Sequence, residues 1–197
     1  MKRFLVLAVL AVLLWSGISP HDRFTWFMEV FPVLIGLPVL VIWRQRLPFT
    51  LLVYVLLAIH ACILMVGGKY TYAEVPLGYW MEGWFGFARN NYDRIGHLAQ
   101  GFVPALVFRE LLLRNTALRP GRWLTFLVFC CCMALSACYE LLEWGTAVAT
   151  GTAADAFLGT QGDVWDTQED MMMAAVGAIA ALLSLTRLQD RLLKGER

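Results

Sequence analysis

Residues 49–67 read FTLLVYVLLAIHACILMVG, a run that contains no Asp, Glu, Lys or Arg. A helix needs about 20 mostly apolar residues to cross the hydrocarbon core of a bilayer, so this run predicts a membrane-spanning helix. Five further apolar segments occupy approximately residues 4–19, 27–43, 94–113, 123–146 and 167–186. The sequence therefore predicts an all-α, polytopic membrane helix bundle with about six transmembrane helices, which forms one integral membrane domain over residues 1–197.

The composition agrees with a membrane protein. Hydrophobic residues make up 59% of the 197 positions, and the mean hydropathy is +0.63. Only 16% of the residues are charged, against roughly 25% in soluble domains. The five cysteines all lie inside apolar segments, where cysteine usually behaves as a small hydrophobic residue. This composition excludes an ordinary soluble domain.

The distribution of Lys and Arg predicts the orientation, because cytoplasmic loops are enriched in these residues. With the N-terminus in the cytoplasm, twelve of the sixteen basic residues are cytoplasmic: Lys2, Arg3, Arg44, Arg46, Arg109, Arg114, Arg119, Arg122, Arg187, Arg191, Lys194 and Arg197. We therefore expect both termini in the cytoplasm. The basic residues are spread over several segments, so no nucleic-acid partner is expected. No small-x-small cleavage site follows the first apolar segment, which favours a retained helix over a signal peptide.

The outer connection over residues 68–93 is long and rich in aromatic side chains. Tyr and Trp favour the membrane–water interface, and this connection contains Tyr79, Trp80 and Trp84. We expect it to lie along the outer surface, with a short amphipathic helix over the bundle.

Polar residues gather at the outer ends of three predicted helices. Asp93 and His97 are four residues apart and share one helix face, near which Gln100 follows. Glu140 and Glu143 are three residues apart at the outer end of the next segment. Ionisable groups inside membrane segments are expensive, and they mark functional sites by default.

The third group precedes and opens the last apolar segment. Asp163, Asp166 and Asp170 have i, i+3 and i+7 spacing and form one acidic stripe. A helix N-terminus favours negative charge, and Asp163 is a candidate N-cap. The three groups together predict one outward-facing polar cluster.

So many carboxylates in one place require protonation or a counter-charge. One histidine with several carboxylates suits Zn²⁺, Mn²⁺ or Mg²⁺, whereas carboxylates alone favour Ca²⁺ or Mg²⁺. Arg94 offers partial compensation as an ion pair. His60, about two turns below the outer surface, is a candidate additional ligand or supporting group.

Plainer interpretations stay open beside the cation site. The whole cluster can be a structural network of ion pairs and hydrogen bonds, and Asp163 can be a helix cap alone. His60 can be a histidine that is hydrogen-bonded within the bundle. Arg109 and Glu110, at the cytoplasmic end of their segment, are expected to form a solvated pair.

Three stretches carry a family resemblance: YDRIGH with Gln100 over residues 92–100, YELLEW over 139–144, and GTQGDVWDTQ with Asp170 over 159–170. With them the chain resembles the bacterial inner-membrane family typified by YjdF, over the second to sixth apolar segments. The resemblance implies a multi-pass protein of the bacterial inner membrane. It implies an architecture and no particular reaction.

More distantly, the chain is similar to VanZ-like membrane proteins, which carry Asp-Lys-x-x-His at one helix start, Glu on the next helix and Asp-x-x-x-Asn at another. Asp93, His97, Glu140 or Glu143, and Asp166 match this pattern. Arg94 replaces the Lys, and Asp170 replaces the Asn and adds a carboxylate. VanZ-like proteins are linked to glycopeptide resistance, so this resemblance points to cell-envelope lipids.

The sequence leaves three functions open. The first is an enzyme at the outer leaflet that acts on a lipid or lipid-linked head group. In it His97, Glu143, Asp166 and Asp170 hold a divalent cation, Asp93 orients His97, and Glu140 is the catalytic acid–base group. The second is a non-catalytic binding or accessory protein. The third is a small proton-coupled transporter, which the apolar inner halves of the helices disfavour.

Overall fold

The computed structural model describes residues 2–43, 45–46, 48–151, 155–158 and 160–195. Within these ranges all regular structure is helical and no strand occurs, which confirms the predicted all-α class. Arg44 and Arg197, used to predict the orientation, and Gly159 of the quoted motif lie outside the described residues.

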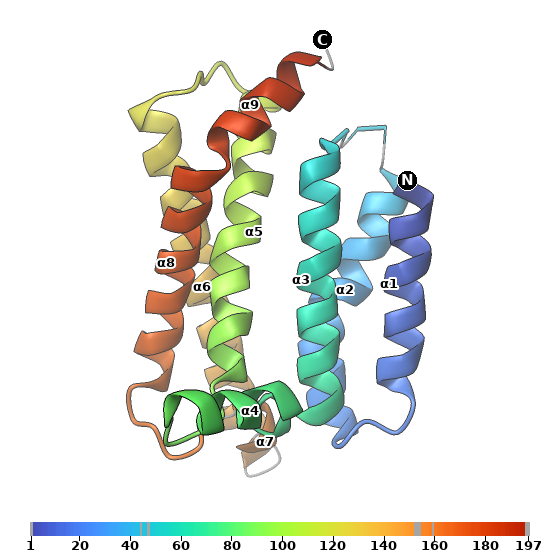
Figure 1. The fold of residues 1–197 in the computed structure, drawn as a ribbon, viewed down its shortest axis with the longest axis vertical. Helices are drawn as coiled ribbons and strands as arrows, with labels where there is room; N and C mark the ends of the chain where they lie inside the picture. The colour runs from blue at the N-terminus through green and yellow to red at the C-terminus, as the bar shows by residue number, and fades with distance from the viewer. Residues whose placement is uncertain (1, 44, 47, 152–154, 159, 196–197) are drawn as a thin grey trace.

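Six long helices lie side by side in one bundle (Figure 1): α1 (Lys2–Gly17), α2 (Arg23–Ile42), α3 (Leu51–Tyr70), α5 (Tyr92–Asn115), α6 (Arg122–Thr150) and α8 (Asp166–Ser184). They correspond to the six apolar segments of the sequence. The short helices η1 (Tyr72–Glu74), α4 (Pro76–Phe85) and α7 (Asp155–Leu158) lie at one end, and α9 (Thr186–Gly195) lies at the other. We call these the outer and the cytoplasmic end, after the predicted orientation.

Not all six helices are equally apolar. Among the described residues, α2, α3 and α6 are long and apolar enough to cross a membrane. The pair α8 and α9, bent by 55°, counts as a fourth when it is taken as one span, and α1 is a shorter apolar helix. The helix α5 is outside this set, because it carries charged residues at both ends. The structure therefore supports three or four candidate spans by length and composition.

The closest packing in the bundle joins α5 to α8 through two glycines. A Cβ atom built on Gly101 would lie 1.8 Å from the Ala174 carbonyl oxygen, and one on Gly177 would lie 2.0 Å from the Leu98 carbonyl oxygen. Glycine permits such backbone approach because it has no side chain. The close contact at these glycines sets α5 and α8 in a fixed register, which positions the polar groups at their outer ends.

The cytoplasmic ends of α3, α5 and α9 are joined by a buried polar network. Glu110 is fully buried; it accepts hydrogen bonds from the Thr50 backbone N–H at 2.7 Å and from Arg114 at 2.8 Å. Arg109 donates to Gln189 at 2.9 Å and to Asp190 at 2.7 Å. The predicted solvated Arg109–Glu110 pair is therefore wrong, because each residue points into a helix contact and binds other partners.

We expect Glu110→Gln to lower the free energy of unfolding by roughly 2 kcal/mol, because hydrogen bonds to a charged group contribute about 1.5–3 kcal/mol. The amide removes the charge that Arg114 and Thr50 contact. Unfolding of the purified protein in mixed micelles measures this loss. Glu74→Gln changes an exposed acid that pairs with exposed His21, and it should change stability by less than about 1 kcal/mol.

The outer end carries the aromatic connection. The helix α4 lies across this end of the bundle (Figure 1), and it exposes Tyr79, Trp80, Trp84 and Phe85. The expected short helix in the outer connection is thus present.

At the same end Asp22 caps α2 by accepting a hydrogen bond from the Thr25 N–H at 2.6 Å, and this bond lowers the pKa of the Asp22 carboxyl.

Candidate functional site

The polar residues predicted on three separate helices lie together at the outer end of the bundle. Asp93 and His97 come from the first turns of α5, Glu140 and Glu143 from the second half of α6, and Asp170 from the start of α8. Their exposed fractions are 2–9%. Because α5 packs against both α6 and α8, residues that are distant in the sequence face one another here.

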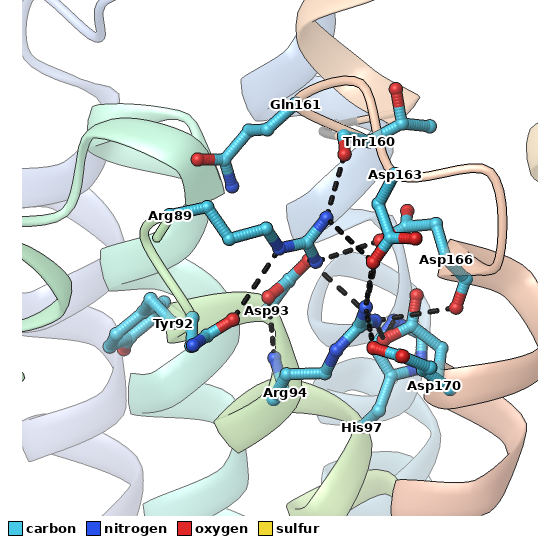
Figure 2. Close-up of polar contacts among 12 residues, drawn as sticks. Arg89, Tyr92, Asp93, Arg94, His97, Thr160, Gln161, Asp163, Asp166 and Asp170 are labelled. Atoms are coloured by element: carbon cyan, nitrogen blue, oxygen red, sulfur yellow. Dashed lines mark hydrogen bonds and ion pairs between the residues drawn. The ribbon is translucent and has the colours of Figure 1, made fainter. Parts of the chain in front are cut away.

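Two arginines organise the outer part of this cluster (Figure 2). Arg89, just before α5, places Nη2 2.8 Å from Asp93 Oδ2 and 2.7 Å from Asp166 Oδ1. It also donates to the Thr160 carbonyl oxygen at 2.6 Å. A guanidinium group suits such a site, because its planar donors reach several oxygens at once. Arg89 therefore joins the loop before α8 to the start of α5.

Arg94 is the centre of the larger set of ion pairs. Its Nη2 lies 3.1 Å from Asp166 Oδ1 and 2.8 Å from Glu169 Oε2, and its Nη1 pairs with Asp170. Asp163 Oδ2 lies 3.3 Å from the same Nη2. The carboxylates that open α8 are thus compensated by arginines from one side.

His97 lies deeper, between two carboxylates. Its Nε2 is 3.6 Å from Asp170 Oδ1, and its Nδ1 is 3.7 Å from Glu140 Oε1. Gln100 Oε1 lies 3.3 Å from Nδ1. The ligand atoms of His97, Glu140 and Asp170 all lie within 4.8 Å of one another. This arrangement differs from that around the arginines, because no Lys or Arg makes a described ion pair with Glu140.

Glu140 has an unusual environment for a carboxylate. The residue is 7% exposed, and its Oε1 is buried with no hydrogen-bond partner among the described residues. Leaving a buried acceptor without a partner costs about 1–3 kcal/mol, and more for a charged group. A buried polar atom of this kind calls for a bound proton, water or ion to complete its contacts.

A small cavity of about 110 Å³ adjoins these residues, and its lining includes Glu29, His60, Tyr72, His97, Glu143 and Asp170. A water molecule occupies roughly 30 Å³ of the liquid, so the space accommodates an ion with a few waters. Tyr139 donates a hydrogen bond to Glu29 Oε2 at 3.3 Å beside the cavity. Several polar side chains therefore reach a cavity whose remaining wall is apolar.

The predicted candidates occupy different positions within the cluster. Asp93 contacts Arg89 and the Arg94 backbone N–H, and Asp166 contacts both arginines. Asp163 is not the N-cap of α8, which is Trp165; instead it accepts a hydrogen bond from the Trp165 N–H at 2.9 Å. His60 lines the cavity, and its Nε2 is buried without a partner among the described residues.

Several members of the cluster escaped the sequence analysis. Arg89 lies in a loop, and nothing in its local pattern marks it as buried. Glu169 lies off the acidic stripe, yet its carboxylate reaches Arg94. Glu29 is 5% exposed, and it is the one acid within the apolar segment over residues 27–43. That isolated charge is the signal that could have identified it.

Comparisons with known proteins agree with the family resemblance. Residues 1–191 match the family described as "Predicted membrane protein (DUF2238)". The chain is 50% identical over 188 residues to "Inner membrane protein YjdF" of Escherichia coli (strain K12). The aligned region covers 95% of this chain and 90% of that protein. No solved structure matches the chain. The chain therefore belongs to the DUF2238 family of membrane proteins, with YjdF as a relative, and is a protein of the bacterial inner membrane.

Proposed function

We propose that the protein is a cation-dependent enzyme that acts on a lipid or lipid-linked head group at the outer leaflet of the inner membrane. The observation that carries this proposal is the buried, unpartnered Oε1 of Glu140 beside His97. A divalent cation next to this oxygen would satisfy it. The function therefore depends on whether the cluster binds such an ion.

The donor set favours His97, Glu140 and Asp170 as the cation ligands. A metal-bound histidine usually donates its other ring N–H to a carboxylate or carbonyl oxygen, and His97 has a carboxylate beside each ring nitrogen. One nitrogen with carboxylate oxygens suits Zn²⁺ or Mn²⁺. Asp166 pairs with both arginines, whereas Asp170 pairs with Arg94 and also lies beside His97, so Asp170 is the better candidate ligand of the two.

The excess of acidic groups supports the same conclusion. The described cluster holds two arginines, Arg89 and Arg94. Its carboxyl groups are Glu29, Asp93, Glu140, Glu143, Asp163, Asp166, Glu169 and Asp170. Buried carboxylates cannot all stay ionised at close range without compensation. A divalent cation supplies the missing positive charge on the side of the cluster away from the arginines.

The cavity gives Glu143 the acid–base role in this proposal. Glu143 is 9% exposed and lines the cavity, whereas Glu140 lies with the proposed ligands. A divalent cation held by His97, Glu140 and Asp170 would supply Lewis-acid polarisation of a phosphoryl or carbonyl oxygen or of a water. Glu143 accepts or returns the proton at the reacting oxygen. Glu140 and Glu143 thus exchange the roles that their sequence positions suggested.

Binding of Mn²⁺ and Zn²⁺ to the purified protein tests the proposal. Wild-type protein stripped with a chelator should bind one ion per chain, as measured by calorimetry and elemental analysis. His97→Ala and Glu140→Gln should each weaken binding by more than about 100-fold. Changes to residues that only hydrogen-bond to metal ligands already lower metal affinity roughly 10–100-fold.

Glu74→Gln provides the matched control, because Glu74 is an exposed acid at the same end of the bundle. It should bind the ion as the wild type does. Equal affinity in His97→Ala, Glu140→Gln and wild type would show that His97 and Glu140 are not cation ligands. If the wild-type protein bound neither ion, the cluster would be a structural network of ion pairs and the proposed function would fail.

The proposed orientation has six membrane crossings with both termini cytoplasmic. Two features support it: α1, α2, α3, α5, α6 and α8 lie side by side, and the start of α1 and the end of α9 lie at the same end of the bundle (Figure 1). The surrounding helices shield the charges of α5, so this helix can cross although it is less apolar. Cysteine accessibility from either side of the membrane measures the orientation.

The packing disfavours a transport pathway. Between the cluster and the cytoplasmic end, an apolar core that includes Ala105, Leu106, Val128 and Ala178 is buried to 0% exposure. Ions and protons need polar groups or water along a pathway through a membrane protein. The described structure therefore favours chemistry at one face of the membrane over movement across it.

A further inference from the structure

A second cavity, of about 530 Å³, lies between α1, α2 and α3. Its volume falls within the roughly 300–1,000 Å³ of small-molecule sites. Most of its lining is aliphatic and includes Val6, Val33, Leu37, Leu57, Ala61 and Leu64. We call this cavity the apolar crevice.

The apolar crevice adjoins the polar cavity of the site. Pro32 of α2 and His60 and Leu64 of α3 line both spaces. At this junction, His60 Nε2 is buried and has no hydrogen-bond partner among the described residues. The junction therefore offers a polar contact where the apolar crevice meets the polar cavity of the site.

We propose that the apolar crevice binds one hydrocarbon chain of a membrane lipid whose head group lies at the polar cavity beside His60. This inference rests on the proposed function. The crevice holds the hydrocarbon part of the substrate, and the polar cavity holds the head group that reacts. The hydrocarbon chain runs from His60, which lies halfway along α3, toward Arg3, which lines the crevice near the start of α1. It therefore points away from the outer end, as the tail of an outer-leaflet lipid does, and it occupies the cytoplasmic half of the bundle.

A hydrocarbon chain suits this crevice better than a protein segment does. A peptide in the crevice would bring backbone N–H and C=O groups against aliphatic side chains, and each group without a partner is costly inside a membrane. A lipid chain has no such groups. It leaves His60 free to bind the single polar part that follows the chain.

The variant Gly36→Leu tests occupancy by filling the crevice. Gly36 lines it, and a Cβ atom at this position meets no atom of the described residues within 4 Å, so the added side chain enters open space. The matched control is Ile35→Phe on the exposed side of the same helix, where Ile35 is 50% exposed. Size exclusion and tryptophan emission confirm that both variants are folded.

The probe is phosphatidylglycerol with a diazirine in one acyl chain, in nanodiscs of phosphatidylethanolamine and phosphatidylglycerol. After irradiation, wild-type protein should carry the label mainly at crevice residues such as Ala61 and Leu64. Gly36→Leu should reduce this labelling at least fivefold, and Ile35→Phe should leave it unchanged. Equal labelling of the crevice and of exposed Phe126 on α6, or no loss in Gly36→Leu, would overturn the proposal.

Two further variants determine the direction of the lipid. His60→Leu should reduce crevice labelling, whereas Arg3→Gln should not. The opposite result would place the head group at the cytoplasmic end and overturn the proposal. These experiments use no divalent cation, so failure of lipid binding is distinguishable from failure of cation binding by His97 and Glu140.

Discussion

Replacement of Gly101 by alanine is expected to lower the free energy of unfolding by about 3 kcal/mol, the upper part of the usual range for overpacked sites. The new Cβ atom would lie 1.8 Å from the Ala174 carbonyl oxygen and 2.6 Å from its carbonyl carbon. Backbone atoms cannot move aside as a flexible side chain does. The two helices must separate or slide, and the outer polar groups of α5 and α8 then lose their register. Unfolding in mixed micelles measures the loss.

A matched change elsewhere should have the opposite sign. For Gly145 of α6, a built Cβ meets no packing neighbour within 4 Å in the described part of the chain, and alanine in a helix interior is favoured over glycine by roughly 0.5–1 kcal/mol. Gly145→Ala should therefore be neutral or slightly stabilising. If Gly101→Ala and Gly145→Ala had the same effect, the close α5–α8 contact would not be important for stability.

The second large effect is expected at Arg94. Arg94→Ala should lower the free energy of unfolding by about 3–5 kcal/mol, the range for breaking a buried ion pair by removing one partner. The change leaves Asp166 and Asp170, which are 6% and 2% exposed, without this guanidinium. Arg89 remains near Asp166 but has no described ion pair with Asp170. The carboxylates must then repel one another, bind protons or take up water.

Two variants separate the role of charge from that of shape. Arg94→Lys keeps the positive charge but has one compact ammonium group in place of a planar fork, so it should recover only part of the loss. Arg23→Ala removes an exposed arginine at the same end of the bundle and should be close to wild type. A wild-type stability in Arg94→Ala would contradict a structural role for this network.

The sequence predicted the helices well because hydrophobic segments and their interruptions mark them directly. The run around His60 became α3, and the break after Ile42 became a connection. The number of membrane crossings is harder to predict, because α5 hides charged ends inside the bundle. Arg109 and Glu110 lower the mean hydropathy of the segment whether they are exposed or buried, and the structure buries both between neighbouring helices.

The candidate site was predictable only where helix spacing brings residues together. Asp93 and His97 share a face by their four-residue spacing, and they do lie in one cluster with Asp170. The partners supplied by loops were not predictable, because Arg89 reaches Asp166 through tertiary packing alone. In the same way, no spacing rule states that Asp166 faces arginines while Glu140 faces a histidine.

The buried charges of α5 also bear on how the chain enters the membrane. Arg94 and Arg109 are fifteen residues apart, and a helix rises about 1.5 Å per residue, so these positions lie roughly 22 Å apart along α5. In the proposed orientation α5 crosses a hydrocarbon layer of about 30 Å. Each such residue disfavours independent insertion by up to about 3 kcal/mol at the helix centre. α5 is therefore expected to integrate stably only after α3, or together with α8, whose polar groups receive its charges. Biogenesis of the bundle should then be cooperative, because the stable integration of α5 depends on helices that precede and follow it in the chain.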